Sequence, residues 1–61
     1  MTEEQVVNVI AKQIREYRQN GHVYYGQKML KAAEGQFDKA HTLETLAFAL
    51  GVLDAVNAQT A

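Results

Sequence analysis

Residues 42–56, TLETLAFALGVLDAV, carry the strongest periodic pattern in the chain. Leucines recur there at every third or fourth position, at Leu43, Leu46, Leu50 and Leu53. This spacing places them along one face of a helix, and Thr42 in front of them is a residue type that caps helix N-termini. We therefore expect a helix near residues 42–58, preceded by a turn through residues 39–41.

The remaining circumference of this predicted helix is also largely apolar. Its other apolar residues are Ala47, Phe48, Ala49, Val52, Ala55 and Val56. A helix that is apolar all round has to be covered all round, and a small three-helix unit leaves one side of its last helix open. We expect Phe48, Val52 and Val56 to be exposed on that side and to bind a partner.

The N-terminal part of the chain predicts a first helix near residues 3–20. Thr2 and Gln5 form a capping-box pattern, in which the threonine hydroxyl and the glutamine side chain satisfy free backbone amides. The apolar stripe that follows consists of Val7, Ile10, Ile14 and Tyr17. Asn20-Gly21 is a favourable helix end, because glycine adopts the left-handed conformation without steric cost.

A second helix is expected near residues 23–39. Its start is ambiguous, because the segment His22-Val23-Tyr24-Tyr25-Gly26 contains residues that favour extended structure. From residue 27 the pattern is helical, with a shared apolar face at Leu30, Ala33, Phe37 and Ala40. This face keeps its phase across Gly35, which we therefore place on the solvent side of an uninterrupted helix.

Composition agrees with an all-α, small three-helix unit in which residues 1–61 form a single helical domain. The chain has no proline, four glycines and no cysteine. A domain of this size buries only ~60% of its unfolded surface, and no disulfide can supplement the core, so we expect a homodimeric or higher helical bundle. The predicted core comprises Val7, Ile10, Ile14, Leu30, Phe37, Leu43, Leu46, Leu50 and Leu53.

Charge and hydropathy favour a cytoplasmic protein without membrane contact. The net charge of −1 provides no overall field toward nucleic acid or an anionic membrane. The N-terminus is acidic, and no run approaches the ~20 apolar residues of a membrane-spanning helix.

A local basic and aromatic cluster nevertheless supports an alternative function. Residues 12–31 hold five cations and one acid, interleaved with tyrosines. Such a mixture can hold phosphates and stack bases, and its candidate nucleic-acid- or nucleotide-binding residues are Arg15, Arg18, His22, Tyr24, Tyr25 and Lys28. Tyrosines at the edge of a small core and solvated cations explain the same pattern, and we favour that explanation. A helix-turn-helix reader fits poorly, because the second helix would open with bulky residues.

Enzymatic chemistry has little support in the sequence. The chain contains neither serine nor cysteine, its glycines are isolated, and no cofactor motif is present. His41 and Glu44 could share a helix face, but two ligands do not make a metal site, so we predict no metal and no cofactor.

These observations favour a small non-enzymatic protein-interaction module. An adaptor, an inhibitor or a regulatory subunit would bind a larger protein through apolar helix faces, as bacterial and phage accessory proteins often do. The predicted partners are a second copy of the chain and another protein. The alternatives are a nucleic-acid or nucleotide binder and a purely self-associating structural protein.

Overall fold

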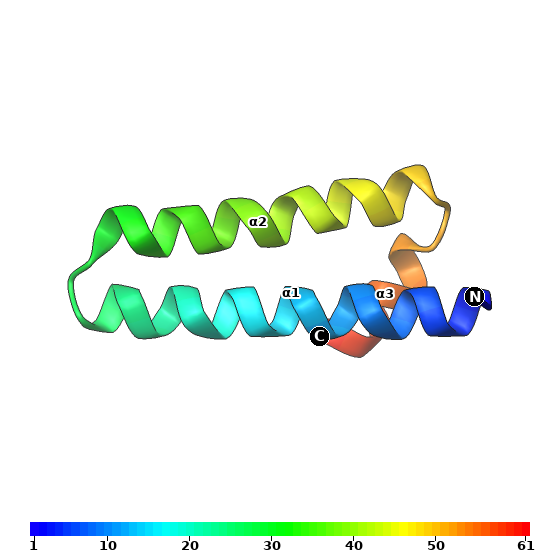
Figure 1. Ribbon diagram of the computed structural model, residues 1–61, viewed down its shortest axis with the longest axis horizontal. Helices are drawn as coiled ribbons and strands as arrows, with labels where there is room; N and C mark the ends of the chain where they lie inside the picture. Colours follow the sequence, from blue (N-terminus) through cyan, green and yellow to red (C-terminus); the bar gives the residue numbers. More distant parts are fainter.

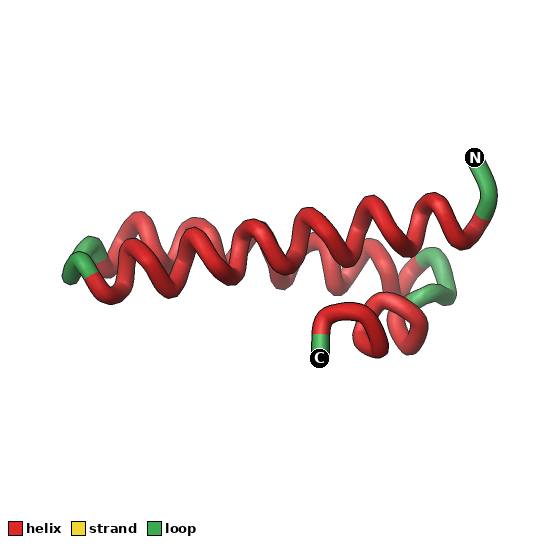
Figure 2. The backbone as a smooth tube through the Cα atoms, turned by 90° about the horizontal axis from the view of Figure 1, so that it is seen from below, coloured by secondary structure: helices red, strands yellow, loops and turns green.

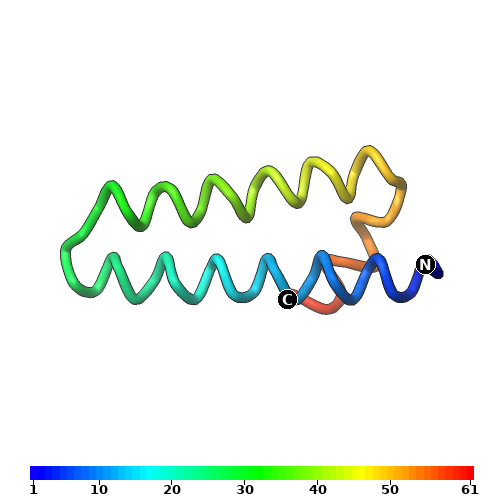
Figure 3. The backbone as a smooth tube through the Cα atoms, in the orientation of Figure 1, coloured from blue at the N-terminus to red at the C-terminus, as the bar shows by residue number.

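The computed structural model describes all 61 residues and contains three helices and no strand (Figure 1). Helix α1 spans Glu3–Gly26, α2 spans Leu30–Ala49 and α3 spans Leu53–Thr60. The path of the chain is an antiparallel hairpin of α1 and α2, after which α3 turns back along the N-terminal half of α1 (Figure 3). The predicted all-α class and the number of helices are confirmed. None of the helices is both long and apolar enough to cross a membrane.

Helix α1 begins as its sequence predicts. The Thr2 hydroxyl accepts a hydrogen bond from the Gln5 amide at 3.2 Å, and the Gln5 side-chain oxygen accepts one from the Thr2 amide at 2.9 Å. This reciprocal pair satisfies two amides that have no partner inside the helix. The predicted stripe is also confirmed, because Val7, Ile10 and Ile14 are buried in the core.

The predicted end of this helix at Gly21 is wrong, since α1 continues to Gly26. Gly21 is buried inside the helix, where its missing side chain makes room for the ring of Phe37 on α2. The chain turns instead at residues 27–29, where Lys28 adopts a left-handed conformation with φ 62°. The Tyr24 carbonyl accepts hydrogen bonds from the amides of both Gln27 and Met29 in this turn.

Helix α2 starts later and ends later than predicted. It passes through Gly35 without interruption, as expected, and also through residues 39–42, where we expected a turn and an N-cap. The Thr42 hydroxyl does not cap a helix but donates to the Asp38 carbonyl at 3.0 Å, one turn earlier in the same helix. A threonine whose hydroxyl is satisfied in this way is tolerated within a helix.

Gly51 ends α2, so the row of leucines that was predicted for one helix is divided between two. Gly51 has φ 75°, its amide donates to the Phe48 carbonyl, and the Val52 amide donates to the Ala47 carbonyl. This is the Schellman arrangement that ends helices. Leu43 and Leu46 therefore lie on α2 and Leu53 on α3, so the helix predicted for residues 42–58 does not exist as one element.

The core is smaller than predicted, and its composition differs. Its cluster comprises Val7, Ile10, Ala11, Ile14, Ala40, Ala47, Val52 and Val56. Alanines spaced seven residues apart along α2 allow its backbone to approach α1 closely, so larger side chains on its flanks stay outside. Leu30, Leu46 and Leu50 are exposed, contrary to prediction. Phe37, Leu43 and Leu53 are half-buried.

The helices form an elongated molecule of 38 × 18 × 16 Å. Viewed at right angles to Figure 1, α1 and α2 make one layer, and α3 lies on one side of that layer (Figure 2). Two hydrogen bonds hold the C-terminal end of α3 on α1: Gln59 donates to the Asn8 side chain at 2.7 Å, and Arg15 donates to the Gln59 carbonyl at 3.3 Å. The other side of the hairpin carries no helix.

Candidate protein-interaction site

The predicted basic and aromatic residues do not lie on a turn. Arg15, Arg18 and His22 are within α1, at spacings of three and four residues that place them on one stripe. Tyr24 follows Arg15 by about two and a half helical turns and so belongs to the opposite side of α1. Tyr25 is exposed in the last turn, and Lys28 lies beyond the helix end. The structure brings Arg15, Arg18 and His22 together, with Tyr25 three residues after His22 on the same side of the helix, and separates Tyr24 from them.

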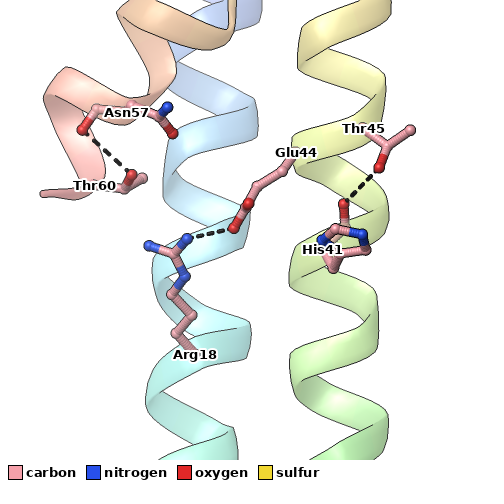
Figure 4. Close-up of polar contacts among 6 residues, drawn as sticks. All are labelled: Arg18, His41, Glu44, Thr45, Asn57 and Thr60. Carbon is pink, nitrogen blue, oxygen red and sulfur yellow. Dashed lines mark hydrogen bonds and ion pairs between the residues drawn. The ribbon is translucent and has the colours of Figure 1, made fainter.

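The members of this stripe contact neighbouring helices. Arg18 forms an ion pair with Glu44 of α2 (Figure 4), and Arg15 donates to the backbone of α3. The His22 ring packs edge-on against Phe37, with centroids 5.3 Å apart and an interplanar angle of 74°. Both arginines therefore contact another helix, and the charge of Arg18 is compensated by Glu44, whereas Arg15 contacts a neutral carbonyl and keeps its charge.

The three predicted partner anchors have different environments. Val56 is fully buried and Val52 is 7% exposed, so their predicted exposure is wrong. Both enter the core because the Gly51 turn redirects the chain and lays α3 against α1. Phe48 precedes that turn and keeps 72% of its surface exposed, as predicted.

Phe48 stands at the common edge of two surface hollows, which both also include Leu53. One hollow has a volume of about 240 Å³ and is completed by Gly51 and Asp54. The other has a volume of about 200 Å³ and is completed by His41, Glu44 and Thr45. We refer to all residues that line either of these two hollows as the Phe48 surface. The sequence pattern missed Leu53 and Asp54 as members, because they come beside Phe48 only through the turn at Gly51.

Local hydrogen bonds hold the polar side of the Phe48 surface. Thr45 donates its hydroxyl proton to the His41 carbonyl at 3.1 Å, and Glu44 is held by Arg18 (Figure 4). No lysine or arginine lines either hollow, whereas Glu44 and Asp54 both do. The surface therefore combines an exposed aromatic ring with a polar rim of acidic character.

The pair His41 and Glu44, considered above as metal ligands, does line one hollow together. Glu44 is engaged by Arg18, and no group of three or more His, Asp or Glu side chains comes together around one point.

No protein-family model matches the chain, and comparison with curated proteins and with solved structures finds no significant similarity.

Proposed function

We propose that this chain is a non-enzymatic protein-interaction module, such as an adaptor, an inhibitor or a regulatory subunit, that binds a larger protein through the Phe48 surface. The observation that supports this proposal is the exposed ring of Phe48 between two hollows. A phenylalanine left in water forgoes about 1.5–3 kcal/mol of burial energy, which a partner can recover. Aromatic anchors surrounded by a polar rim are typical of interface hot spots.

Charge indicates what the partner presents. The rim contains two carboxylates and no cation, so an apolar side chain flanked by lysine or arginine complements it. Because Glu44 is already paired with Arg18, Asp54 is the carboxylate available to such a cation. We therefore propose a partner segment that places one apolar side chain against Phe48 and Leu53 and a basic side chain near Asp54.

Binding of a macromolecule is favoured over binding of a small substrate. Both hollows are smaller than the ~300 Å³ at which ligand pockets begin. They are open to solvent on either side of an exposed ring, and the chain has no serine or cysteine to act as a nucleophile. A surface of this shape suits contact with a partner helix or loop.

The first experiment compares three tagged proteins: the wild type, Phe48→Lys, and the matched control Val9→Lys. Val9 is 51% exposed on α1, outside the Phe48 surface. Phe48 lies in the last turn of α2, which has no basic residue, so a lysine there is favourable for the helix. Circular dichroism is expected to show unchanged helicity for both variants.

Each protein is used to capture partners from bacterial lysate with and without nuclease treatment, and to probe a peptide array in which one leucine or phenylalanine is flanked by lysines or by glutamates. We expect wild type and Val9→Lys to retain the same proteins and the lysine-flanked peptides, and Phe48→Lys to lose both. Equal retention by Phe48→Lys would contradict the proposal. Binding that disappears with nuclease and falls steeply with salt would favour the nucleic-acid alternative through Arg15 and Arg18.

A further inference from the structure

A second apolar surface lies on the side of the hairpin that α3 does not cover. Leu43 and Leu46 of α2 and Leu50 at its C-cap follow one another at steps of three and four residues, on one stripe. The hollow beside Leu43 is lined by Tyr17 of α1 and shares no residue with the two hollows around Phe48. The stripe of Tyr17 on α1 also carries half-buried Val6 and Tyr24. We call these six residues the open face.

None of the six residues of the open face is charged. Leu46 is 46% exposed and Leu50 is 54% exposed, although leucine is a residue that the core would accommodate. The hollow between Tyr17 and Leu43 has a volume of about 310 Å³ and is large enough to receive a bulky side chain. The one cation that lines this hollow is Lys39. Its Nζ atom lies 5.7 Å from the centroid of the Tyr17 ring, and its aliphatic stem adds apolar surface to the face.

We infer that the open face binds a second copy of this chain, so that two hairpins form a two-fold symmetric four-helix bundle. The core of one copy gives the first reason. Only ten residues are buried, four of them are alanines, and the only large side chains that are fully buried are Ile14 and Val56. Helical units of this size need more buried apolar surface than this, and the leucines of the open face provide it when a second copy covers them.

The dimensions of the face give the second reason. The open side of the hairpin is the broad side of the molecule, which measures 38 by 18 Å (Figures 1 and 2). A stable interface requires at least ~600 Å² from each partner, which a face of this size can supply if most of it is covered. An isologous dimer uses the same face twice and covers both copies at once.

The charges at the edge of the face give the third reason. Asp38 and Lys39 both line the hollow beside Tyr17, and neither has an ion-pair partner within the chain. A two-fold axis that passes near this hollow brings Lys39 of each copy toward Asp38 of the other. The edge is therefore self-complementary, as an isologous contact requires.

This dimer leaves the Phe48 surface accessible, because α3 and Phe48 are on the other side of each hairpin. The two Phe48 surfaces would face in opposite directions. A partner that presents two binding segments could then be held more tightly than by one copy alone, a consequence that rests on the function proposed above. The dimer itself does not depend on that function, so the two proposals can fail separately.

Sedimentation equilibrium and light scattering across a wide range of protein concentration test the dimer. We expect a mass of twice 6.8 kDa for the wild type, and the same for Phe48→Lys, whose substitution lies outside the open face. Leu46→Lys is expected to raise the dissociation constant about 100-fold or more, because it places a charge in the apolar centre of the interface. A monomeric wild type, or a dimer that Leu46→Lys does not weaken, would overturn the inference.

Leu46→Lys can also lower helicity if one copy alone is unstable, so a second set of variants uses exposed positions. Lys39→Asp places two acids side by side in each copy and is expected to raise the dissociation constant about 3- to 10-fold. The double exchange Asp38→Lys with Lys39→Asp keeps opposite charges at the edge and is expected to restore dimerisation. Equal dissociation constants for Lys39→Asp and the wild type, measured at low salt, would contradict the predicted contact.

Discussion

Gly21 on α1 lies directly beneath the ring of Phe37 on α2, so close that a Cβ atom at Gly21 would stand 2.7 Å from the Cε1 and Cζ atoms of that ring. The edge-on contact of His22 with the same ring fixes it from the adjacent position of α1. Gly21 is therefore a packing residue at the end of the hairpin that is farthest from α3, where no other helix supports the contact between α1 and α2.

Gly21→Ala is expected to lower the free energy of unfolding by up to about 2 kcal/mol, because the overlap of the added methyl group with the Phe37 ring outweighs the gain in helix propensity. Gly35→Ala is the matched control, since that glycine is also inside a helix and a Cβ atom added to it would have no neighbour within 4 Å. Gly35→Ala should raise the free energy of unfolding by about 0.5–1 kcal/mol through helix propensity alone. Urea denaturation followed by circular dichroism measures both, and equal effects of the two substitutions would contradict the close packing at Gly21.

The ion pair of Arg18 and Glu44 is expected to contribute little to stability. Their side chains are 38% and 29% exposed, so water and salt screen the attraction. A double-mutant cycle with Arg18→Gln and Glu44→Gln should give a coupling energy below about 1 kcal/mol that decreases as salt is added. A coupling well above that value, and insensitive to salt, would show that the pair is more deeply buried than the structure describes.

Thr42 distinguishes the helix boundary seen in the structure from the boundary that the sequence predicts. If Thr42 were an N-cap, its replacement by alanine would lower the free energy of unfolding by about 1 kcal/mol. Within α2, the same replacement should be neutral or stabilising by a few tenths of a kcal/mol, because alanine is the better helix residue. Thr2→Ala, at the true N-cap of α1, should cost about 1 kcal/mol and serves as the comparison. If Thr42→Ala lowered the free energy of unfolding as much as Thr2→Ala, Thr42 would be an N-cap and the turn predicted before it would be correct.

The sequence was informative where local signals are sufficient. The capping box at Thr2 and the stripe through Val7, Ile10 and Ile14 depend on residues close together in the chain, and both are confirmed. The all-α class follows from the absence of proline and from the apolar periods, which span most of the chain.

The helix boundaries could not be read from the same signals, because tertiary contacts decide how a glycine is used. Gly21 and Gly51 have the same intrinsic freedom, yet one fits under an aromatic ring within a helix and the other ends a helix with a positive φ. No residue near Gly21 in the sequence indicates that it packs against Phe37. Once Gly51 is recognised as the stop, the burial of Val52 and Val56 follows, because the chain turns back there toward α1.

The candidate site was predicted only in part for the same reason. Phe48 is exposed as expected from an apolar surplus on the last predicted helix. Leu53 and Asp54 join it because a turn intervenes, and the valines leave it because α3 packs on α1. The apolar content of a predicted helix does not distinguish a residue that stays exposed from one that the chain's own helices bury.

The most direct test of the assignment of Phe48 to the surface and Val56 to the core is the free energy of unfolding of Phe48→Ala and Val56→Ala, measured by urea denaturation at one protein concentration. Phe48→Ala removes the larger side chain but is expected to change stability by less than about 0.5 kcal/mol, because Phe48 is 72% exposed. Val56→Ala is expected to cost about 1–3 kcal/mol, because Val56 is fully buried. The reverse order, with Phe48→Ala the more damaging change, would place Phe48 in the core and leave the proposed interaction surface without its anchor.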